Sequence, residues 1–188
     1  DQHAARFDDQ EKNFEAVTRQ TLDLTGIYLS PNDTVLDFGC ATGSITLALA
    51  PSVKSLLGLD FSAEMIKEAE KKLAASRQAN CSFIQGTIYT EYLQPASFDK
   101  IVSYSVLHLL DDCEEAVRRI HELLKPGGLF ISTTACFRER KTFSKWKEVR
   151  AIRRQIRQGT FPLHLNLYRV SDVEKLLSDQ GFRVEASE

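Results

Sequence analysis

Long apolar runs are absent from this sequence. No stretch approaches the roughly 20 consecutive apolar residues that a helix needs to cross a bilayer, so we expect no membrane span. Low-complexity tracts and an apolar leader are also missing from the sequence, which favours an ordinary globular protein of the cytoplasm. The hydrophobic share of 43% and the charged share of 27% agree with that class.

Cysteine is scarce and widely spaced. Successive cysteines lie 23 to 41 residues apart, with no Cys-x-x-Cys pair and no nearby pair of histidines. This spacing does not match the common zinc sites, and we expect no metal and reduced thiols. The cysteines are Cys40, Cys81, Cys113 and Cys136.

Positive charge is concentrated in one segment. Residues 138–157 hold nine of the 24 lysines and arginines, opposed only by Glu139 and Glu148, although the net charge of the chain is −2. The other residues are therefore acidic on balance. A general nucleic-acid-binding face is not expected.

Apolar runs of strand length alternate with helical patterns of about 10 to 15 residues. This order predicts an α/β fold: a doubly wound, mostly parallel, Rossmann-like sheet with helices on both faces. The length of 188 residues fits one domain, residues 1–188. The predicted strands are Thr34–Phe38, Ser55–Asp60, Cys81–Gln85, Lys100–Ser105, Leu129–Thr134 and Arg183–Ala186.

Capping residues mark three of the predicted helices. Ser62 begins the first, and capping boxes at 112–115 and 171–174 begin the second and third. The second is expected to end at Pro126-Gly127-Gly128, and the third at a left-handed Gly181 with Phe182 packed behind it. The apolar positions expected on one face are Ile66, Ala69 and Leu73 in the first helix and Ala116, Val117, Ile120, Leu123 and Leu124 in the second.

Side chains almost disappear after the first predicted strand, in the run Gly39-Cys40-Ala41-Thr42-Gly43. Either the backbone turns there so tightly that a Cβ would clash, or a ligand approaches the main chain closely. A glycine-rich turn between a strand and a helix also directs backbone N–H groups toward a negative part of a ligand. Both explanations remain open on this run alone.

A carboxylate follows at the end of the second predicted strand. Asp60 lies 21 residues after Gly39, where a carboxylate can accept both hydroxyls of an adenosine ribose. The alternative is that Asp60 only caps the helix beginning near Ser62. Together with the glycine-rich turn, it predicts an adenosine-containing ligand.

The glycine spacing argues against two common adenosine ligands. A dinucleotide fingerprint requires glycines at positions 39, 41 and 44, where this chain has Gly39, Ala41 and Ser44, and its second glycine is Gly43. A phosphate-binding GxxxxGK motif is missing as well. An NAD(P)-dependent oxidoreductase is therefore disfavoured.

Five ordered stretches resemble those of Rossmann-like (class I) S-adenosylmethionine-dependent methyltransferases, in the small-molecule branch that includes the ubiquinone-biosynthesis type. They are VLDFGCATGS, GLDFSAEMI, FIQGTI, FDKIVSYSVLHLLDD and LKPGGLFIS. The similarity covers residues 34–134 and, through SDVEKLLSDQGFRVEAS, most of the chain. It implies S-adenosylmethionine as the cofactor, S-adenosylhomocysteine as the product and a small-molecule acceptor.

The resemblance also implies which residues bind the cofactor. The first motif would lie beside the methionine portion, Asp60 would bind the ribose, and Phe61 and Met65 would flank the adenine. The family usually has an Asp where Thr87 stands, so the adenine contact is weaker or shared with the Ile88 backbone. The implied residues are Asp37, Gly39, Ala41, Gly43, Asp60, Phe61, Met65, Gly86, Thr87, Ile88, Tyr104 and Ser105.

Ala41 stands where a glycine is commoner in the family, a small change if its φ is negative. Tyr104 and Ser105 match the place of methyl transfer in the family. His108 is the candidate general base, although a histidine at a strand-to-helix junction is more often structural. A sulfonium methyl is already activated, so alignment of the acceptor is the main task and an obvious catalytic dyad is not required. A module of this fold that binds without turnover is the principal alternative.

Two further regions carry expectations. Residues 1–30, with Phe14, Val17 and Leu24 at near-helical spacing, predict a helical flank before a turn at 30–33. Residues 136–170 form an insertion that is expected to determine which acceptor binds. Its helical pattern fits either a solvated helix packed on the body of the protein or a basic lid that helps to hold an anionic acceptor. Its residues of interest are Trp146, Val149, Ile152, Ile156, His164 and Tyr168. The family's sheet ends in a sixth and an antiparallel seventh strand, so we expect one more strand beyond Glu188.

Overall fold

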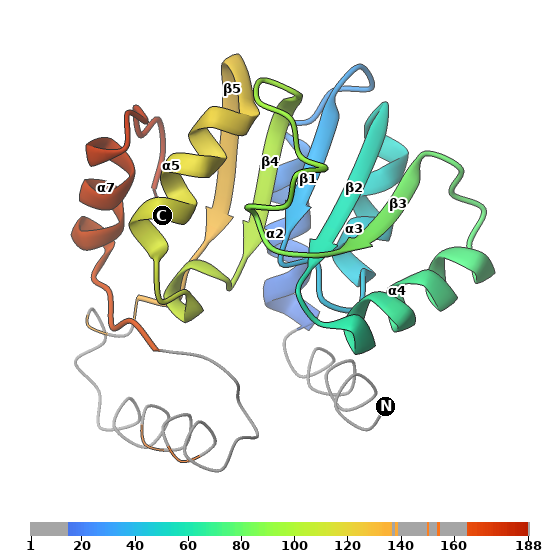
Figure 1. The fold of residues 1–188 in the computed structure, drawn as a ribbon, viewed down its shortest axis with the longest axis horizontal. Coiled ribbons are helices and arrows are strands. Elements are labelled where there is room, and N and C mark those ends of the chain that lie inside the picture. The colour runs from blue at the N-terminus through green and yellow to red at the C-terminus, as the bar shows by residue number, and fades with distance from the viewer. Residues whose placement is uncertain (1–14, 137, 139–149, 151–153, 155–164, 188) are drawn as a thin grey trace. The chain divides into compact units, whose positions relative to one another are not determined.

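The computed structural model describes residues 15–136, 138, 150, 154 and 165–187. Their centre is a five-stranded sheet in the order β3-β2-β1-β4-β5 (Figure 1). β1 pairs in parallel with β2 and with β4, and β2 pairs in parallel with β3. The strands are β1 (Thr34–Phe38), β2 (Ser55–Asp60), β3 (Cys81–Gln85), β4 (Phe98–Tyr104) and β5 (Leu124–Thr133). The predicted α/β class and the parallel sheet are confirmed.

Helices connect these strands, and the chain divides into two compact units. The first is Asp1–Tyr104 with Glu122–Ser132, and the second is Ser105–His121 with Thr133–Glu188. The helices are α2 (Glu15–Gly26), α3 (Ser44–Leu49), α4 (Ala63–Ala75), α5 (Cys113–Leu123) and α7 (Val170–Asp179), with short 3-10 turns at η1 (Ala50–Ser52) and η2 (Leu107–Leu109). That residues 1–188 act as one domain stays a prediction.

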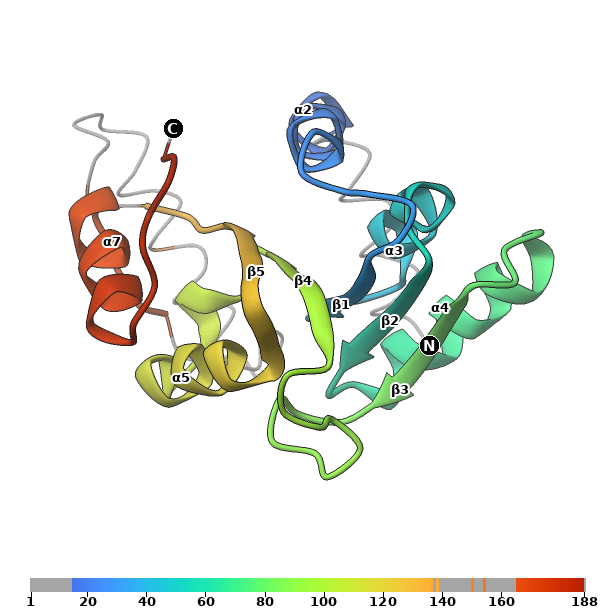
Figure 2. The same cartoon turned by 90° about the horizontal axis from the view of Figure 1, so that it is seen from above.

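The central strands of this sheet are buried on both faces, as β1 shows from Val35 to Phe38. α2, α3 and α4 lie along one face (Figure 2), where Val35, Leu56 and Val102 form a cluster with residues of α3. Leu36 and Ile101, which alternate with them along the strands, are fully buried as well. Strands buried on both faces are expected to be continuous apolar runs, which explains why the sequence reveals them.

The strand order creates a switch point. From β1 the chain winds outward through β2 to β3, and then returns to the other side of β1 with β4. The Ser103 hydroxyl on β4 donates to the Phe38 carbonyl on β1 at 2.9 Å, fixing the ends of these two strands. In doubly wound sheets a ligand binds beyond the carboxyl ends of the strands at such a point.

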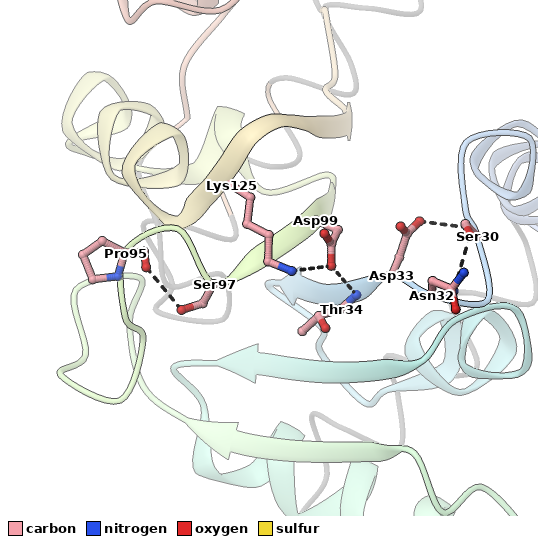
Figure 3. A network of polar contacts seen from close by, with 8 residues as sticks. All are labelled: Ser30, Asn32, Asp33, Thr34, Pro95, Ser97, Asp99 and Lys125. Atoms are coloured by element: carbon pink, nitrogen blue, oxygen red, sulfur yellow. Dashed lines mark hydrogen bonds and ion pairs between the residues drawn. The ribbon is translucent and has the colours of Figure 1, made fainter.

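A polar network fixes the opposite ends of these strands (Figure 3). Asp99 Oδ2 accepts from the Thr34 N–H at 2.9 Å and from Lys125 Nζ at 2.8 Å, joining β4, β1 and β5. The predicted turn at 30–33 is confirmed, because the Asp33 N–H donates to the Ser30 carbonyl and Asp33 Oδ2 accepts from the Ser30 N–H. This network lies at the amino-terminal ends of the strands, away from the switch point.

Helix α4 begins as predicted. Ser62 is its N-cap, accepting from the Met65 N–H at 3.4 Å. Ile66 and Ala69 are buried in one cluster, and Leu73 packs against it. The helix is therefore held to the sheet by its apolar face.

Within the second unit, Gly181 ends α7 with φ 91°, as predicted. The Phe182 N–H donates to the Leu177 carbonyl at 3.1 Å, and the Phe182 ring meets the His121 ring edge-on with centroids 5.0 Å apart. α7 begins at Val170 instead of after a Ser171 cap, because Asp172 Oδ2 accepts from the Arg169 N–H at 2.8 Å. The capping carboxylate is thus Asp172 and not Glu174.

Three strand predictions are corrected. Residues 183–186 form no strand: the part of the chain that the structure describes offers them no ladder partner. β4 runs over 98–104, because Ser105 turns left-handed with φ 60°. β5 begins at Leu124, so α5 ends at Leu123 and Pro126-Gly127-Gly128 lies inside the strand.

The N-terminal flank is confirmed only from Glu15, where α2 begins. Within this helix Leu24 is exposed, and the neighbouring Thr25 is buried. Phe14 and most of the insertion, including Trp146, Val149, Ile152, Ile156 and His164, lie outside the described residues. Within the described segments, none of the helices is long and apolar enough to span a bilayer.

Candidate functional site

The loop between β1 and α3 contains three left-handed residues. Gly39, Ala41 and Gly43 have φ values of 81°, 47° and 73°. The N–H groups of Gly39 and Cys40 both donate to the Leu59 carbonyl, at 2.8 and 3.0 Å. These bonds tie the loop to β2 directly beyond the carboxyl end of β1. The backbone reversal explains much of the scarcity of side chains, since left-handed positions favour glycine.

Gly43 is needed for packing as well as for its backbone conformation. A Cβ there would lie 2.6 Å from Phe83 Cζ and 2.9 Å from Ala69 Cβ, closer than real contacts allow. A Cβ on Gly58 would also collide with the Phe83 ring. Of the two explanations for the bare loop, the tight protein turn is therefore correct at Gly43. A cofactor contact there would have to use the backbone.

Ala41 differs from the expectation of a negative φ. Its left-handed conformation costs a non-glycine residue about 1–2 kcal/mol, so the replacement of a glycine is not the small change foreseen. The Ala41 N–H donates to Asp60 Oδ2 at 3.0 Å, which holds this conformation. Strain of this kind is common at functional sites.

Asp60, at the end of β2, holds both the loop and the following helix. Its Oδ2 accepts from Ala41, and its Oδ1 accepts from the Ser62 N–H at 2.9 Å. Asp60 is therefore not the cap of α4 but holds the capping residue, Ser62, through its backbone N–H. Each carboxylate oxygen has about two acceptor positions, so one on each oxygen remains for a ligand hydroxyl. Burial raises the pKa of Asp60, and the two N–H bonds oppose this rise.

Asp37 is a second buried carboxylate, on β1. Its Oδ2 accepts from the Thr46 hydroxyl at 2.6 Å, whereas Oδ1 has no hydrogen-bond partner within the described part of the chain. Burial raises the pKa of Asp37 to about 7. The hydrogen bond from Thr46 lowers this pKa, and the negative charge of Asp60 raises it further. A buried acceptor without a donor costs about 1–3 kcal/mol. The arrangement therefore favours a positively charged donor at Oδ1.

The expected adenine-binding residues lie at the ends of β2 and β3. Phe61 directly follows Asp60 and is 52% exposed, and its carbonyl accepts from Gln85 Nε2 at 3.2 Å. Met65 is half-buried in the first turn of α4. Asp60 Oδ1 holds Ser62, which lies between Phe61 and α4, the helix that carries Met65.

Residues 86–88 directly follow the end of β3. The Gly86 N–H donates to the Asp60 carbonyl at 2.9 Å, and a Cβ on Gly86 would only touch Leu59 and Thr90 at 3.5 Å. The fold therefore does not require a glycine here. Thr87 is exposed, whereas Ile88 is fully buried, so its side chain belongs to the core.

Tyr104, at the end of β4, has its hydroxyl engaged. It shares a hydrogen bond of 2.8 Å with the Thr25 hydroxyl on α2, and burial raises its pKa. Tyr104 therefore joins α2 to the sheet within the first unit. A role at the point of methyl transfer would use its ring or backbone.

His108 and Ser105 belong to the second unit. The His108 ring is buried, its Nδ1 lies 3.5 Å from the Ala135 N–H, and its carbonyl accepts from the Asn166 N–H at 2.8 Å. Burial lowers the pKa of His108 to about 4, so the imidazole is neutral at pH 7 and weakly basic. The Ser105 N–H donates to the Thr133 carbonyl at 2.9 Å. This geometry favours the structural interpretation of His108.

Three contacts of the loop and its neighbours could not be predicted from the sequence. Thr46 binds Asp37, Thr25 binds Tyr104, and Lys72 Nζ donates to the hydroxyls of Thr42 and Ser44. A threonine inside a short helix was the only local signal, for Thr46. The other two pairs are brought together by tertiary packing.

Comparison with known proteins agrees with this geometry. Residues 29–179 match the sequence model of a family described as a methyltransferase domain. The chain belongs to this methyltransferase family. The methyltransferase domain is 30% identical over 159 residues to juvenile hormone acid O-methyltransferase of Bombyx mori, a match covering 80% of this chain and 56% of that protein. It thus spans little more than half of this relative.

Other relatives point to the same family. Demethylmenaquinone methyltransferase of Lactococcus lactis is 34% identical over 112 residues, 58% of this chain and 42% of that protein. Among solved structures, a Haemonchus contortus phosphoethanolamine N-methyltransferase 2, in complex with phosphomonomethylethanolamine and S-adenosylhomocysteine, has a TM-score of 0.70 at 21% identity. That match covers 87% of this chain and 37% of that protein, and it shows the fold. The predicted Rossmann-like methyltransferase resemblance is confirmed.

Proposed function

We propose that this chain is an S-adenosylmethionine-dependent methyltransferase acting on a small-molecule acceptor. The observation that carries the proposal is the hydrogen bonding of the Asp60 carboxylate. Both of its oxygens accept one protein N–H, which fixes the carboxylate at the switch point and leaves one acceptor position on each oxygen. Two adjacent ribose hydroxyls fit this pattern of acceptors.

The remaining groups supply a binding residue for each part of the cofactor. Asp37 Oδ1, buried and without a donor among the described residues, suits the methionine ammonium. Phe61 and Met65 would hold the adenine ring between them, and the Thr87 hydroxyl or the Ile88 backbone would meet its amino group. The left-handed loop at Gly39–Gly43 would lie beside the methionine carbons.

The chemistry of the bound cofactor is a methyl group activated on sulfonium, which an acceptor attacks in line. The protein's part is to hold the acceptor and to exclude water from it. Because the His108 imidazole is neutral and weakly basic, we infer acceptors that are nucleophilic without proton removal. Carboxylates, phenolates and free amines meet this condition.

An anionic acceptor is favoured within that group. One relative is named for O-methylation of juvenile hormone acid, and the insertion 136–170 of this chain is rich in lysine and arginine. Cationic side chains near the acceptor would raise the local concentration of an anion. A module that binds S-adenosylmethionine without turnover remains the second candidate, since Thr87 replaces the usual carboxylate and a strong base is lacking in the described residues.

Two measurements test the proposal. Calorimetric titration should show binding of S-adenosylhomocysteine and no binding of NAD, and the reverse result would indicate an oxidoreductase. Transfer of a labelled methyl group from S-adenosylmethionine should then be followed over a panel of carboxylates, phenols and amines. Tight cofactor binding with no transfer to any class of acceptor would favour the non-catalytic module.

A further inference from the structure

Lys72, in the last turn of α4, reaches the loop that precedes α3. Its Nζ donates to Thr42 Oγ1 at 2.8 Å and to Ser44 Oγ at 2.9 Å. The two hydroxyl oxygens lie 3.5 Å apart, so the ammonium bridges the loop at Thr42 and the first residue of α3, Ser44. Thr42 is only 1% exposed, so at least one of these bonds is shielded from water. Hydrogen bonds from a charged donor are stronger than neutral ones.

We propose that Lys72 is a positioning residue that holds the cofactor loop Gly39–Ser44 in its binding conformation. The proposal rests on the function proposed above for this loop. Thr42 stands between Ala41 and Gly43, both left-handed, so fixing its side chain restrains the two unusual residues at once. Such backbone conformations persist only where the surroundings determine them fully.

The loop is held from two sides. Asp60 accepts from the Ala41 N–H at the end of β2, and Lys72 donates to Thr42 from α4. Asp60 would also meet the ribose, so it combines holding the loop with binding the ligand. Lys72 is not among the residues proposed to bind the cofactor, so its substitution tests the holding of the loop without removing a proposed ligand contact.

Removing the ammonium should affect the loop more than the helix. α4 is also anchored by its apolar face, because Ile66 and Ala69 lie in the buried cluster around Phe83, which includes Cys40 of the loop. A loop that is already fixed loses less freedom when a ligand binds, so loosening it lowers affinity. We therefore expect a loss of cofactor affinity that exceeds any loss of stability.

The test compares Lys72→Met with Lys71→Met in the full chain. Lys71 is the adjacent residue of the same helix, is 60% exposed, and pairs with Glu68, so its variant removes the same charge without touching the loop. Calorimetry with S-adenosylhomocysteine should show at least fivefold weaker binding for Lys72→Met and less than a twofold change for Lys71→Met. Lys72→Arg should recover most of the loss.

Hydrogen exchange gives a second readout that does not need a ligand. The amides of residues 41–46 should exchange faster in Lys72→Met than in the parent chain and in Lys71→Met. If Lys72→Met does not fold, Thr42→Val should show the same weaker binding and faster exchange. The probe for affinity throughout is S-adenosylhomocysteine.

The outcomes separate this inference from the proposed function. Failure of the parent chain to bind S-adenosylhomocysteine would contradict the proposed function, while the exchange rates would still test whether Lys72 holds the loop. Equal affinity and equal exchange in Lys72→Met and Lys71→Met would overturn the role of Lys72. Equal losses of affinity in both variants would assign the effect to net charge and would also overturn the role of Lys72.

Discussion

Ala41 donates its backbone N–H to Asp60 Oδ2 at 3.0 Å, joining the strained residue of the loop to the carboxylate at the end of the neighbouring strand. The bond therefore links the proposed binding of a ribose to the conformation of the loop. The carboxylate that would bind a ribose also maintains the backbone shape of the loop beside the methionine portion. Changes at either residue should therefore alter both stability and affinity.

Asp60→Asn should weaken S-adenosylhomocysteine binding at least tenfold, which corresponds to about 1.4 kcal/mol. An amide cannot accept from Ala41, Ser62 and two hydroxyls together, because one of its two terminal atoms is a donor. The same change should lower the free energy of unfolding, since two protein bonds are affected. Calorimetry and urea denaturation measure the two effects.

Asp99→Asn is the matched control for this prediction. Asp99 lies near the amino-terminal end of β4, at the opposite ends of the strands from Asp60, where it accepts from Thr34 and Lys125. Lys125 and Thr34 hold the pKa of Asp99 below its usual value, so its contribution to stability is present above the unfolded pKa and is lost as pH falls through the folded pKa. Its variant should be less stable at neutral pH with unchanged cofactor affinity. Unchanged affinity in Asp60→Asn as well would remove the ribose role.

Ala41→Gly should stabilise the chain by about 0.5–1 kcal/mol. Glycine relieves the left-handed strain, which costs alanine about 1–2 kcal/mol, and part of that gain is lost to the freer unfolded chain. Urea denaturation of the two proteins gives the difference. A loss of stability in Ala41→Gly would show that the residue is not strained there.

Asp37→Asn should raise the stability of the ligand-free chain at pH 8 and leave it nearly unchanged at pH 4. The pKa of Asp37 is raised from 3.8 when unfolded to about 7 in the fold, so the folded state binds the proton more tightly. Stability from this group is complete below about pH 4 and is lost as pH rises toward 7. Denaturation at the two pH values measures this directly.

The same substitution should weaken S-adenosylhomocysteine binding, because the ammonium would lose its carboxylate. In the parent chain, affinity should rise with pH through about 7 as Asp37 ionises. A variant that is both more stable and weaker in binding indicates a carboxylate kept for its ligand. Equal pH dependence in parent and variant would assign the titration to another group.

Gly86→Ala should fold with nearly parental stability. Its added Cβ would make only ordinary contacts, at 3.5 Å from Leu59 and Thr90. Gly43→Ala is the comparison, because its Cβ would meet Phe83 and Ala69 too closely, and it should be strongly destabilised. Thermal unfolding of the pair separates a glycine that the fold needs from one that it does not.

The sequence predicted most of the sheet and the place of Asp60 at the end of a strand. β1, β2 and β3 have the expected bounds. β1 and β2 stand out as apolar runs because they are buried on both faces, whereas β3 alternates between buried and exposed residues over part of its length. Asp60 was found from its distance to Gly39 and its place at a strand end. The start of β5 was missed, because Pro126-Gly127-Gly128 resembles a break, and although Gly127 is left-handed with φ 77°, the strand includes it.

Contacts between distant residues explain what the sequence did not reveal. Thr25 and Tyr104 lie 79 residues apart, and Lys72 and Thr42 lie 30 residues apart, so neither pair leaves a local pattern. The sign of φ at Ala41 depends on hydrogen bonds to β2, which no propensity encodes. Sequence patterns predict where the site lies, and tertiary packing decides how its loop is held.

The most direct test of the account is a crystal structure of the chain with S-adenosylhomocysteine. Both ribose hydroxyls should lie within hydrogen-bond distance of the Asp60 carboxylate, and the ammonium should donate to Asp37 Oδ1, with Ala41 still left-handed. A ribose bound away from Asp60, or a loop that rearranges so that Asp60 meets only protein N–H groups, would contradict it.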